Sequence, residues 1–197
     1  LAAVALACAP VLLPVALVFL VIGLFSSVRG MARVLTVAIA PAVLFAPKII
    51  HALWSGSPLN IFMDPGAVSP FEPGNTWHLL LGFPEFGLEG WGKIFEAIGL
   101  GGAPATLLVG ILMLPLALLA LLGLYTGRIA VTVLSALFGG LGMFIAIMSS
   151  NFVLTTSGDT GVALWPGSGL ALYWLAIVSL AALGAELIGR AAPAVIS

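Results

Sequence analysis

Long uncharged apolar runs dominate the pattern of this chain. Charged residues are absent from 1–28, 97–127, 129–158 and 160–185, and a shorter clean run covers 34–47. A helix needs about 20 apolar residues to cross a bilayer, and these runs are long enough or nearly so. They are also continuous, without the alternation of apolar and polar residues that is typical of the strands of membrane β-barrels. The pattern therefore predicts membrane-spanning helices.

Five such spans are predicted, which makes the expected fold all-α: a polytopic membrane helical bundle that forms a single domain over residues 1–197. The second span extends past Lys48, whose ammonium group can reach the interface by snorkelling. Two longer segments, 55–102 and 150–168, connect spans on one side and are expected to be outer loops. The spans are predicted near 4–27, 33–53, 104–126, 129–149 and 169–188.

Prolines and small residues inside the spans bear on how these helices pack. A proline inside a helix removes a backbone hydrogen bond and bends it, so kinks are expected. Small residues that recur along a helix let neighbouring backbones approach closely. The prolines are Pro10, Pro14, Pro41, Pro47 and Pro115, and the small residues are Gly123 and Gly127, the group Gly139, Gly140 and Gly142, and the stripe Ala181, Ala185 and Gly189.

Composition sharpens the membrane interpretation. Of 197 residues, 62% are hydrophobic, and only six Lys/Arg and seven Asp/Glu are present. A soluble domain has roughly a quarter of its residues charged, so a disordered chain and an ordinary globular enzyme are excluded. The formal net charge of -1 leaves no basic stripe to neutralise phosphates, so no nucleic-acid partner is expected.

The few charges also predict an orientation. One five-span topology places all four arginines on a single side, which should be the cytoplasm. Residue 1 is then outside and residue 197 inside, and Glu186 pairs with Arg190 one turn away. Because the chain starts at Leu1 directly in a span, a longer parent protein is expected, and the lone Cys8 is read as a packing residue. The inner arginines are Arg29, Arg33, Arg128 and Arg190; the outer charges are Lys48, Lys93, Asp64, Glu72, Glu85, Glu89, Glu96 and Asp159.

Two carboxylates in the first outer loop are the candidate catalytic residues. Asp64 precedes Pro65 and Gly66 in a turn signature, where its carboxylate would bond its own backbone. The alternative is that Asp64 or Glu72 acts as a base or metal ligand near the membrane surface.

Six further residues are candidates for substrate binding at the outer side. Lys48 and His51 lie one turn apart and could hold an anionic head group, although snorkelling also accounts for them. Trp77 and His78 form an interfacial pair, and a lone histidine in such a place is more often a polar residue with its hydrogen bonds satisfied than a ligand. In the second loop, Asp159 falls in a turn or short hairpin and Trp165 in an interfacial Trp-Pro-Gly anchor. The two outer loops together could form a polar cleft.

The segment 84–98 predicts a short amphipathic helix on the outer leaflet or packed over the bundle. Glu85, Glu89, Lys93 and Glu96 fall on one helical face, and apolar residues cover much of the rest. Pro84 suits the start of the helix, and Gly99 suits its end.

Standard catalytic motifs are missing from the sequence. It has no Gly-rich phosphate loop, no HExxH and no nucleophile elbow. Its only aspartates are Asp64 and Asp159, so an Asp-x-Asp motif is ruled out. No metal site and no cofactor are expected in this fragment.

Several loop motifs follow one another along the chain: Ala46-Pro47, Leu53-Trp54, Asp64-Pro65-Gly66, the run from Leu79 to Pro84, and Trp165-Pro166-Gly167. Their order resembles the carboxy-terminal membrane region of large actinobacterial family-2 glycosyltransferases. The resemblance covers most of residues 40–190. It implies a role in cell wall biogenesis, an upstream cytosolic transferase domain, and a polyprenyl-phosphate-linked sugar as partner. Since that domain is absent from these residues, no catalytic residue carries over.

Two functions are therefore expected from the sequence. The first is the membrane portion of a glycosyltransferase that assembles cell-envelope polysaccharide or glycolipid in a bacterial cytoplasmic membrane and handles a lipid-linked sugar or glycan. The second is a non-enzymatic membrane subunit, either a scaffold or part of a lipid or glycan exporter. Membrane lipids are partners in both.

Overall fold

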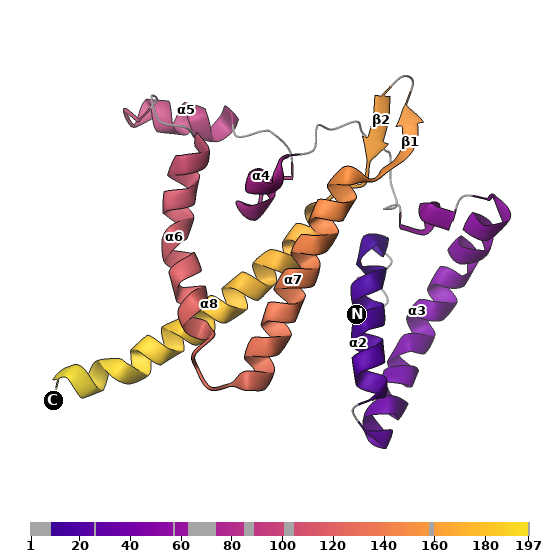
Figure 1. Ribbon diagram of the computed structural model, residues 1–197, viewed down its shortest axis with the longest axis horizontal. Coiled ribbons are helices and arrows are strands. Elements are labelled where there is room, and N and C mark those ends of the chain that lie inside the picture. Colours follow the sequence, from indigo (N-terminus) through magenta and orange to yellow (C-terminus); the bar gives the residue numbers. More distant parts are fainter. Residues whose placement is uncertain are drawn as a thin grey trace. The chain divides into compact units, whose positions relative to one another are not determined.

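The computed structural model describes residues 9–25, 27–56, 58–62, 74–84, 89–100, 105–157 and 160–196. In this part of the chain the structure is helical apart from a two-stranded hairpin (Figure 1). The chain divides into two compact units. The first contains Leu1–Phe71 and Met148–Ser168, and the second contains Glu72–Ile147 and Gly169–Ser197.

An antiparallel helical hairpin forms most of the first unit. A 3-10 turn, η1 (Pro10–Leu12), leads into α2 (Leu13–Leu24), which is followed by α3 (Val28–Trp54) and a second 3-10 turn, η2 (Pro58–Phe62). Ser27 caps α3, because its Oγ accepts a hydrogen bond of 3.0 Å from the backbone N–H of Gly30. Next to the connection the helices are close: a Cβ on Gly23 would overlap a methyl group of Val34.

Helix α3 bends by 40° between its parts Val28–Thr36 and Ala38–Trp54. Pro41 accounts for this position, since a proline ring clashes with the carbonyl four residues earlier, here that of Val37. The hydroxyl of Thr36 also donates to the carbonyl oxygen of Ala32 at 2.8 Å, a bond that favours bending. The kink expected at Pro41 is confirmed.

The second outer loop folds as an antiparallel hairpin of β1 (Val153–Ser157) and β2 (Thr160–Ala163). Ser157 pairs with Thr160 and Val153 with Ala163, with an irregularity in register between Val153 and Thr155. The short hairpin considered for this segment is therefore confirmed.

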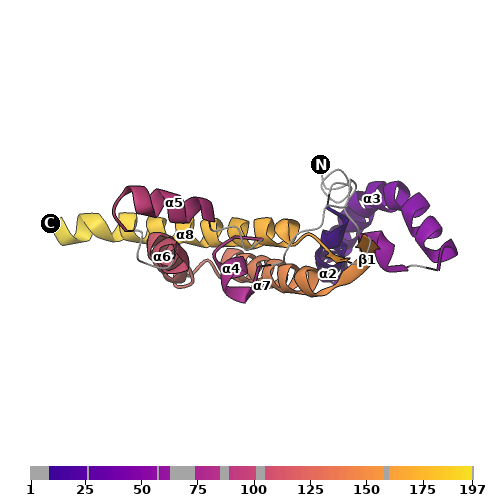
Figure 2. The same ribbon diagram turned by 90° about the horizontal axis from the view of Figure 1, so that it is seen from above.

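Three long helices form the frame of the second unit, and α8 contacts both of the others. They are α6 (Ala105–Gly123), α7 (Ile129–Asn151) and α8 (Gly167–Ile196). The unit also contains two shorter helices, α4 (Thr76–Leu80) and α5 (Glu89–Ala97), which precede α6 in the chain. Figure 2 shows α8 beside α7, and α6, viewed nearly end-on, next to the same helix.

Glycine allows α6 and α8 to touch backbone to backbone. A Cβ on Gly123 would overlap the carbonyl oxygen of Leu180, and one on Gly184 would overlap the carbonyl oxygen of Leu119. Around this contact lies a cluster of buried apolar residues, namely Ala120, Leu180, Ala181 and Leu183. Close backbone approach of this kind is typical of membrane helix pairs.

The contact between α7 and α8 uses glycine in the same way. A Cβ on Gly142 would lie 2.6 Å from the backbone nitrogen of Tyr173, and one on Gly169 would lie 2.7 Å from that of Ala146. Such distances leave no room for any side chain.

The small-residue prediction is confirmed in part. Gly123, Gly139, Gly142 and Ala181 lie at helix contacts. It is wrong for Ala185 and Gly189, which are exposed, and for Gly127 and Gly140, which face open space. A four-residue spacing identifies residues on one side of a helix, but it does not show which side of α8 faces α6. The side of α8 that contacts α6 contains Gly184.

Among the described residues, three helices are long and apolar enough to cross a membrane: α6, α7 and Gly167–Arg190 of α8. The bent α3 makes a fourth if its two parts form one span, and Pro10–Leu24 is a shorter apolar helix. The helical membrane architecture expected from the sequence is thus supported by three to four candidate spans.

Candidate functional site

Both catalytic candidates, Asp64 and Glu72, lie outside the described residues, and so does Asp159. Their proposed roles stay predictions. Within the described part of the chain, no three His, Cys, Asp or Glu residues group to hold a metal ion.

Three of the binding candidates belong to the first unit. Lys48 and His51 lie one turn apart near the end of α3, and His51 is exposed. Trp165, 40% exposed, folds back on Gly167, where a Cβ would overlap its indole nitrogen. Pro166 between them is fully buried, so the Trp-Pro-Gly segment is anchored to the protein.

Trp77 and His78 belong to the second unit, on α4, a helix that the sequence analysis missed. Asn75 caps this helix: its Oδ1 accepts a 3.0 Å hydrogen bond from the backbone N–H of His78. The same oxygen lies 2.6 Å from the Nδ1 of His78, so this ring nitrogen carries the proton and donates. His78 is therefore a polar residue whose ring is hydrogen-bonded within the protein, which is one of the two interpretations of the sequence. Asparagine immediately before a helix is a start signal that could have revealed α4.

Residues 74–84 form a closed loop around α4, called here the capping loop. The backbone N–H of Gly74 donates to the carbonyl of Pro84 at 3.0 Å, which joins the two ends. After α4, Gly82 adopts φ +87°, and Phe83 N–H donates to His78 O at 2.8 Å, in the glycine-terminated pattern common at helix ends. Pro84 thus closes this loop, whereas the following helix, α5, is described from Glu89.

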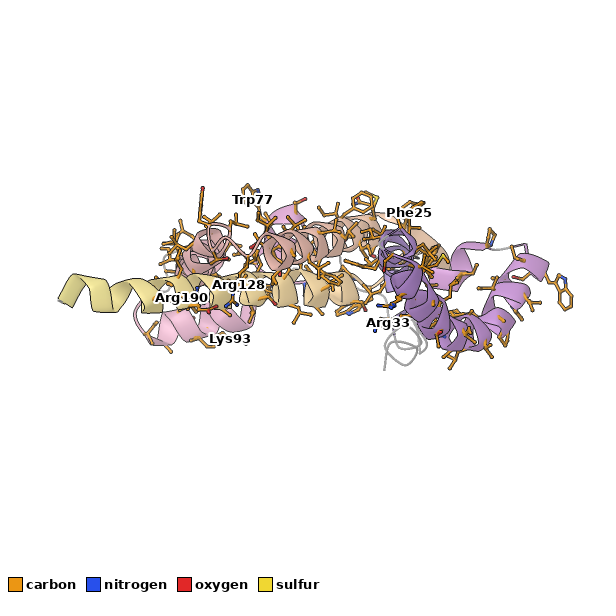
Figure 3. The ribbon with its side chains drawn as sticks, turned by 90° about the horizontal axis from the view of Figure 1, so that it is seen from below. Phe25, Arg33, Trp77, Lys93, Arg128 and Arg190 are labelled. Carbon is orange, nitrogen blue, oxygen red and sulfur yellow. The ribbon has the colours of Figure 1, made fainter. Side chains whose placement is uncertain are left out.

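The capping loop is docked on α7 and α8. Leu79, only 2% exposed, packs in a buried cluster with Ala146 and Leu170. Gly82 lies so close to Trp174 that a Cβ would overlap the indole nitrogen. Trp77 faces away and is 73% exposed (Figure 3). An exposed Trp beside apolar helix ends suits a membrane interface.

The opposite end of α7 and α8 carries an ion-pair cluster. One carboxylate oxygen of Glu186 accepts from Arg128 at 2.8 Å and from Arg190 at 2.5 Å. The pair of Glu186 with Arg190 is confirmed, and Arg128 adds a partner from the α6–α7 connection (Figure 3). Because all three side chains are partly exposed, each pair stabilises the fold by at most about 1 kcal/mol.

The amphipathic helix expected between the outer loop and α6 is present as α5, which lies across the start of α6 (Figure 1). It ends as predicted at Gly99: this residue has φ +82°, and Leu100 N–H donates to Phe95 O at 2.7 Å. Lys93 and Glu96 are exposed, and so are Ile94 and Ile98, at 54% and 63%. This mixture of exposed charged and apolar side chains suits the surface of a bilayer.

Comparisons with protein-family models, with curated proteins and with solved structures find no match to this chain.

Proposed function

We propose that this chain is the membrane portion of a glycosyltransferase that assembles cell-envelope polysaccharide or glycolipid and handles a lipid-linked sugar. The observation that supports it is the order of loop motifs between apolar helices. Four of the five motifs lie in the described part of the chain, and two of them, Leu79 to Pro84 and Trp165-Pro166-Gly167, are anchored by buried residues, whereas Trp54 is exposed. Such anchored loops give fixed positions beside the bilayer, as a site for a lipid-borne substrate requires.

The proposal includes five spans, with α3 as one bent span and Pro10–Leu24 as part of the first. It also includes an orientation with residue 1 outside and residue 197 cytoplasmic. The ion-pair cluster supports one part of this topology, the placing of the α6–α7 connection and the end of α8 on the same side, because it brings them together. The capping loop contacts the other ends of α7 and α8, near Ala146 and Leu170, and so falls on the proposed outer side.

The orientation can be tested by labelling single cysteines in intact cells, with Cys8 replaced by serine. In a Ser69→Cys variant we expect labelling by an impermeant thiol reagent, and in an Ala32→Cys variant we expect none. The reverse pattern would overturn the orientation.

The activity can be tested in membranes that contain the full-length protein, by following transfer of a labelled sugar between lipid-linked donor and glycan. If Asp64 is the base, Asp64→Asn should slow transfer by about 10²- to 10⁴-fold. Ser69→Ala in the same loop should leave the rate unchanged. An unaltered rate for Asp64→Asn would remove Asp64 from the mechanism, and membranes without transfer activity would remove the glycosyltransferase assignment.

A non-enzymatic membrane subunit, such as a scaffold or part of a lipid or glycan exporter, is the second candidate. It is favoured by the bonding of polar groups within the protein, of His78 to Asn75 and of Glu186 to two arginines. The reading frame upstream of Leu1 separates the two candidates, since a transferase domain there would support the enzyme.

A further inference from the structure

The α2–α3 hairpin has an apolar groove along its length. Its volume is about 540 Å³, within the range of sites that hold small ligands. Leu13 to Leu20 of α2 and Arg33 to Ile49 of α3 contribute its walls. Every lining residue except Arg33 is apolar. The groove therefore matches a hydrocarbon chain better than a polar metabolite.

The shape of the groove is also that of a chain. From Arg33 to Ile49 it follows α3 for roughly 24 Å at 1.5 Å per residue. This is most of the roughly 30 Å thickness of a bilayer's hydrocarbon core. The charged residue lies at the end next to the α2–α3 connection, and Leu13 and Ile49 line the other end.

Arg33 has a cationic neighbour, and no acidic one among the described residues of the first unit. Arg29 lies one turn before it on α3, and both side chains are exposed. Within the described part of the first unit there is no Asp or Glu, and neither arginine makes an ion pair with a described residue. Figure 3 shows Arg33 on the same hairpin as the exposed Phe25.

The position of Arg29 and Arg33 favours the binding of an anion next to them. Both lie in the first two turns of α3, where the helix dipole already adds positive potential. Like charges one turn apart also repel each other. A phosphate group would relieve both effects, because guanidinium groups bind phosphate through paired, charge-assisted hydrogen bonds.

We propose that the groove binds one hydrocarbon chain of an anionic phospholipid whose phosphate contacts Arg33 and Arg29. An anionic lipid is also what the cytoplasmic leaflet, on the proposed arginine side, supplies. The choice of leaflet rests on the proposed orientation, whereas the site itself does not depend on the glycosyltransferase assignment.

Native mass spectrometry of the purified full-length protein tests the head-group contact, with phosphatidylglycerol and phosphatidylcholine as probes. We expect phosphatidylglycerol to bind more tightly, and Arg29→Gln with Arg33→Gln to weaken its binding roughly tenfold or more. Arg190→Gln removes one positive charge from the ion-pair cluster and should leave this binding unchanged. Equal binding of the two lipids, or an equal loss in Arg190→Gln, would overturn the proposal.

A second variant tests the groove itself. Ala42→Phe adds a ring to its wall without changing charge, so it should prevent binding of the hydrocarbon chain while both arginines remain. A phosphatidylglycerol carrying a photoreactive group on its chain should label α2 and α3 in the wild type and lose this labelling in Ala42→Phe. The unchanged circular dichroism spectrum of the variant would show that it folds.

Two results would overturn the groove as a lipid site. Full photolabelling of α2 and α3 in Ala42→Phe would mean that only surface charge attracts the lipid. A dimer that persists without lipid and dissociates in Ala42→Phe would identify a second copy of the chain as the occupant.

Discussion

The hairpin of α2 and α3 and the group of α6, α7 and α8 pack their apolar helices in different ways. In the second unit, glycines at Gly123, Gly142, Gly169 and Gly184 bring backbones into direct contact. In the hairpin, the close glycine contact is at Gly23, and farther along α3 an apolar groove remains between the helices. In both units the close approach of apolar helices therefore occurs where a glycine meets the neighbouring helix.

The two arginine groups differ in whether they have an acidic partner among the described residues. Arg128 and Arg190 share Glu186 within the second unit, whereas Arg29 and Arg33 have no acidic partner among the described residues of the first. The first group is paired within the protein, whereas the second is the group to which we assign a lipid phosphate.

The largest effect is expected at Gly184. The methyl group introduced by Gly184→Ala would overlap the carbonyl oxygen of Leu119 and force α6 away from α8, at a cost of about 3 kcal/mol. Gly140→Ala is the control on α7, since nothing lies within 4 Å of its Cβ position, and it should gain up to about 1 kcal/mol. Unfolding in detergent measures both, and similar losses for the two variants would contradict the tight α6–α8 contact.

A smaller loss is expected at Gly82, which combines positive φ with contact to Trp174. Gly82→Ala should destabilise the protein by about 2–3 kcal/mol, from backbone strain plus displacement of the indole. Gly56 has φ +70° but open space around it, so Gly56→Ala should cost only the strain of about 1 kcal/mol. Unfolding measurements compare the two, and a shift in tryptophan fluorescence should accompany Gly82→Ala alone. Equal costs would mean that the contact with Trp174 contributes nothing.

In the hairpin, Pro41→Ala should straighten α3 and narrow the groove. Removing a 40° bend lengthens the span from residue 28 to residue 54 by about 2 Å at 1.5 Å rise per residue. Spin labels at these positions would report the change as a longer distance. Pro47→Ala is the control, since the bend lies between Thr36 and Ala38, and it should leave the distance unchanged. An unaltered distance in Pro41→Ala would assign the bend to another cause.

The smallest effect is expected at Glu186. Glu186→Gln removes two partly exposed ion pairs and should cost about 1 kcal/mol or less, with the loss shrinking as salt is added. Glu96→Gln removes a similar charge from an exposed carboxylate of α5 and should change the stability by less still. A loss at Glu186 that is independent of salt would contradict an electrostatic role.

Local features of this fold could be predicted from the sequence. The apolar runs predicted the long helices, Gly99 predicted the end of α5, and the spacing of Glu186 and Arg190 predicted their pair. Each of these depends on residues within a turn or two of one another, or on a helix-long excess of apolar side chains.

Contacts between distant segments could not be predicted in this way. Sequence spacing identified Gly123 as a contact residue but gave no reason to prefer Gly184 over Ala185 on α8. Arg128 and Glu186 are 58 residues apart. In the sequence, only the prediction that both lie on the same side of the membrane related them to each other. The capping loop was missed because five helical residues carry too weak a periodicity, although Asn75 and Gly82 mark its ends.

The capping loop also has a consequence for the order of assembly during synthesis. Leu79 is buried against Leu170, which the ribosome adds roughly 90 residues later. At about 5–20 residues per second, the loop must wait several seconds undocked while α6, α7 and α8 are still being made. A pulse-chase with protease on the side of the membrane that carries this loop should therefore cut it in nascent chains, and the loop should become protected only after α8 has been made.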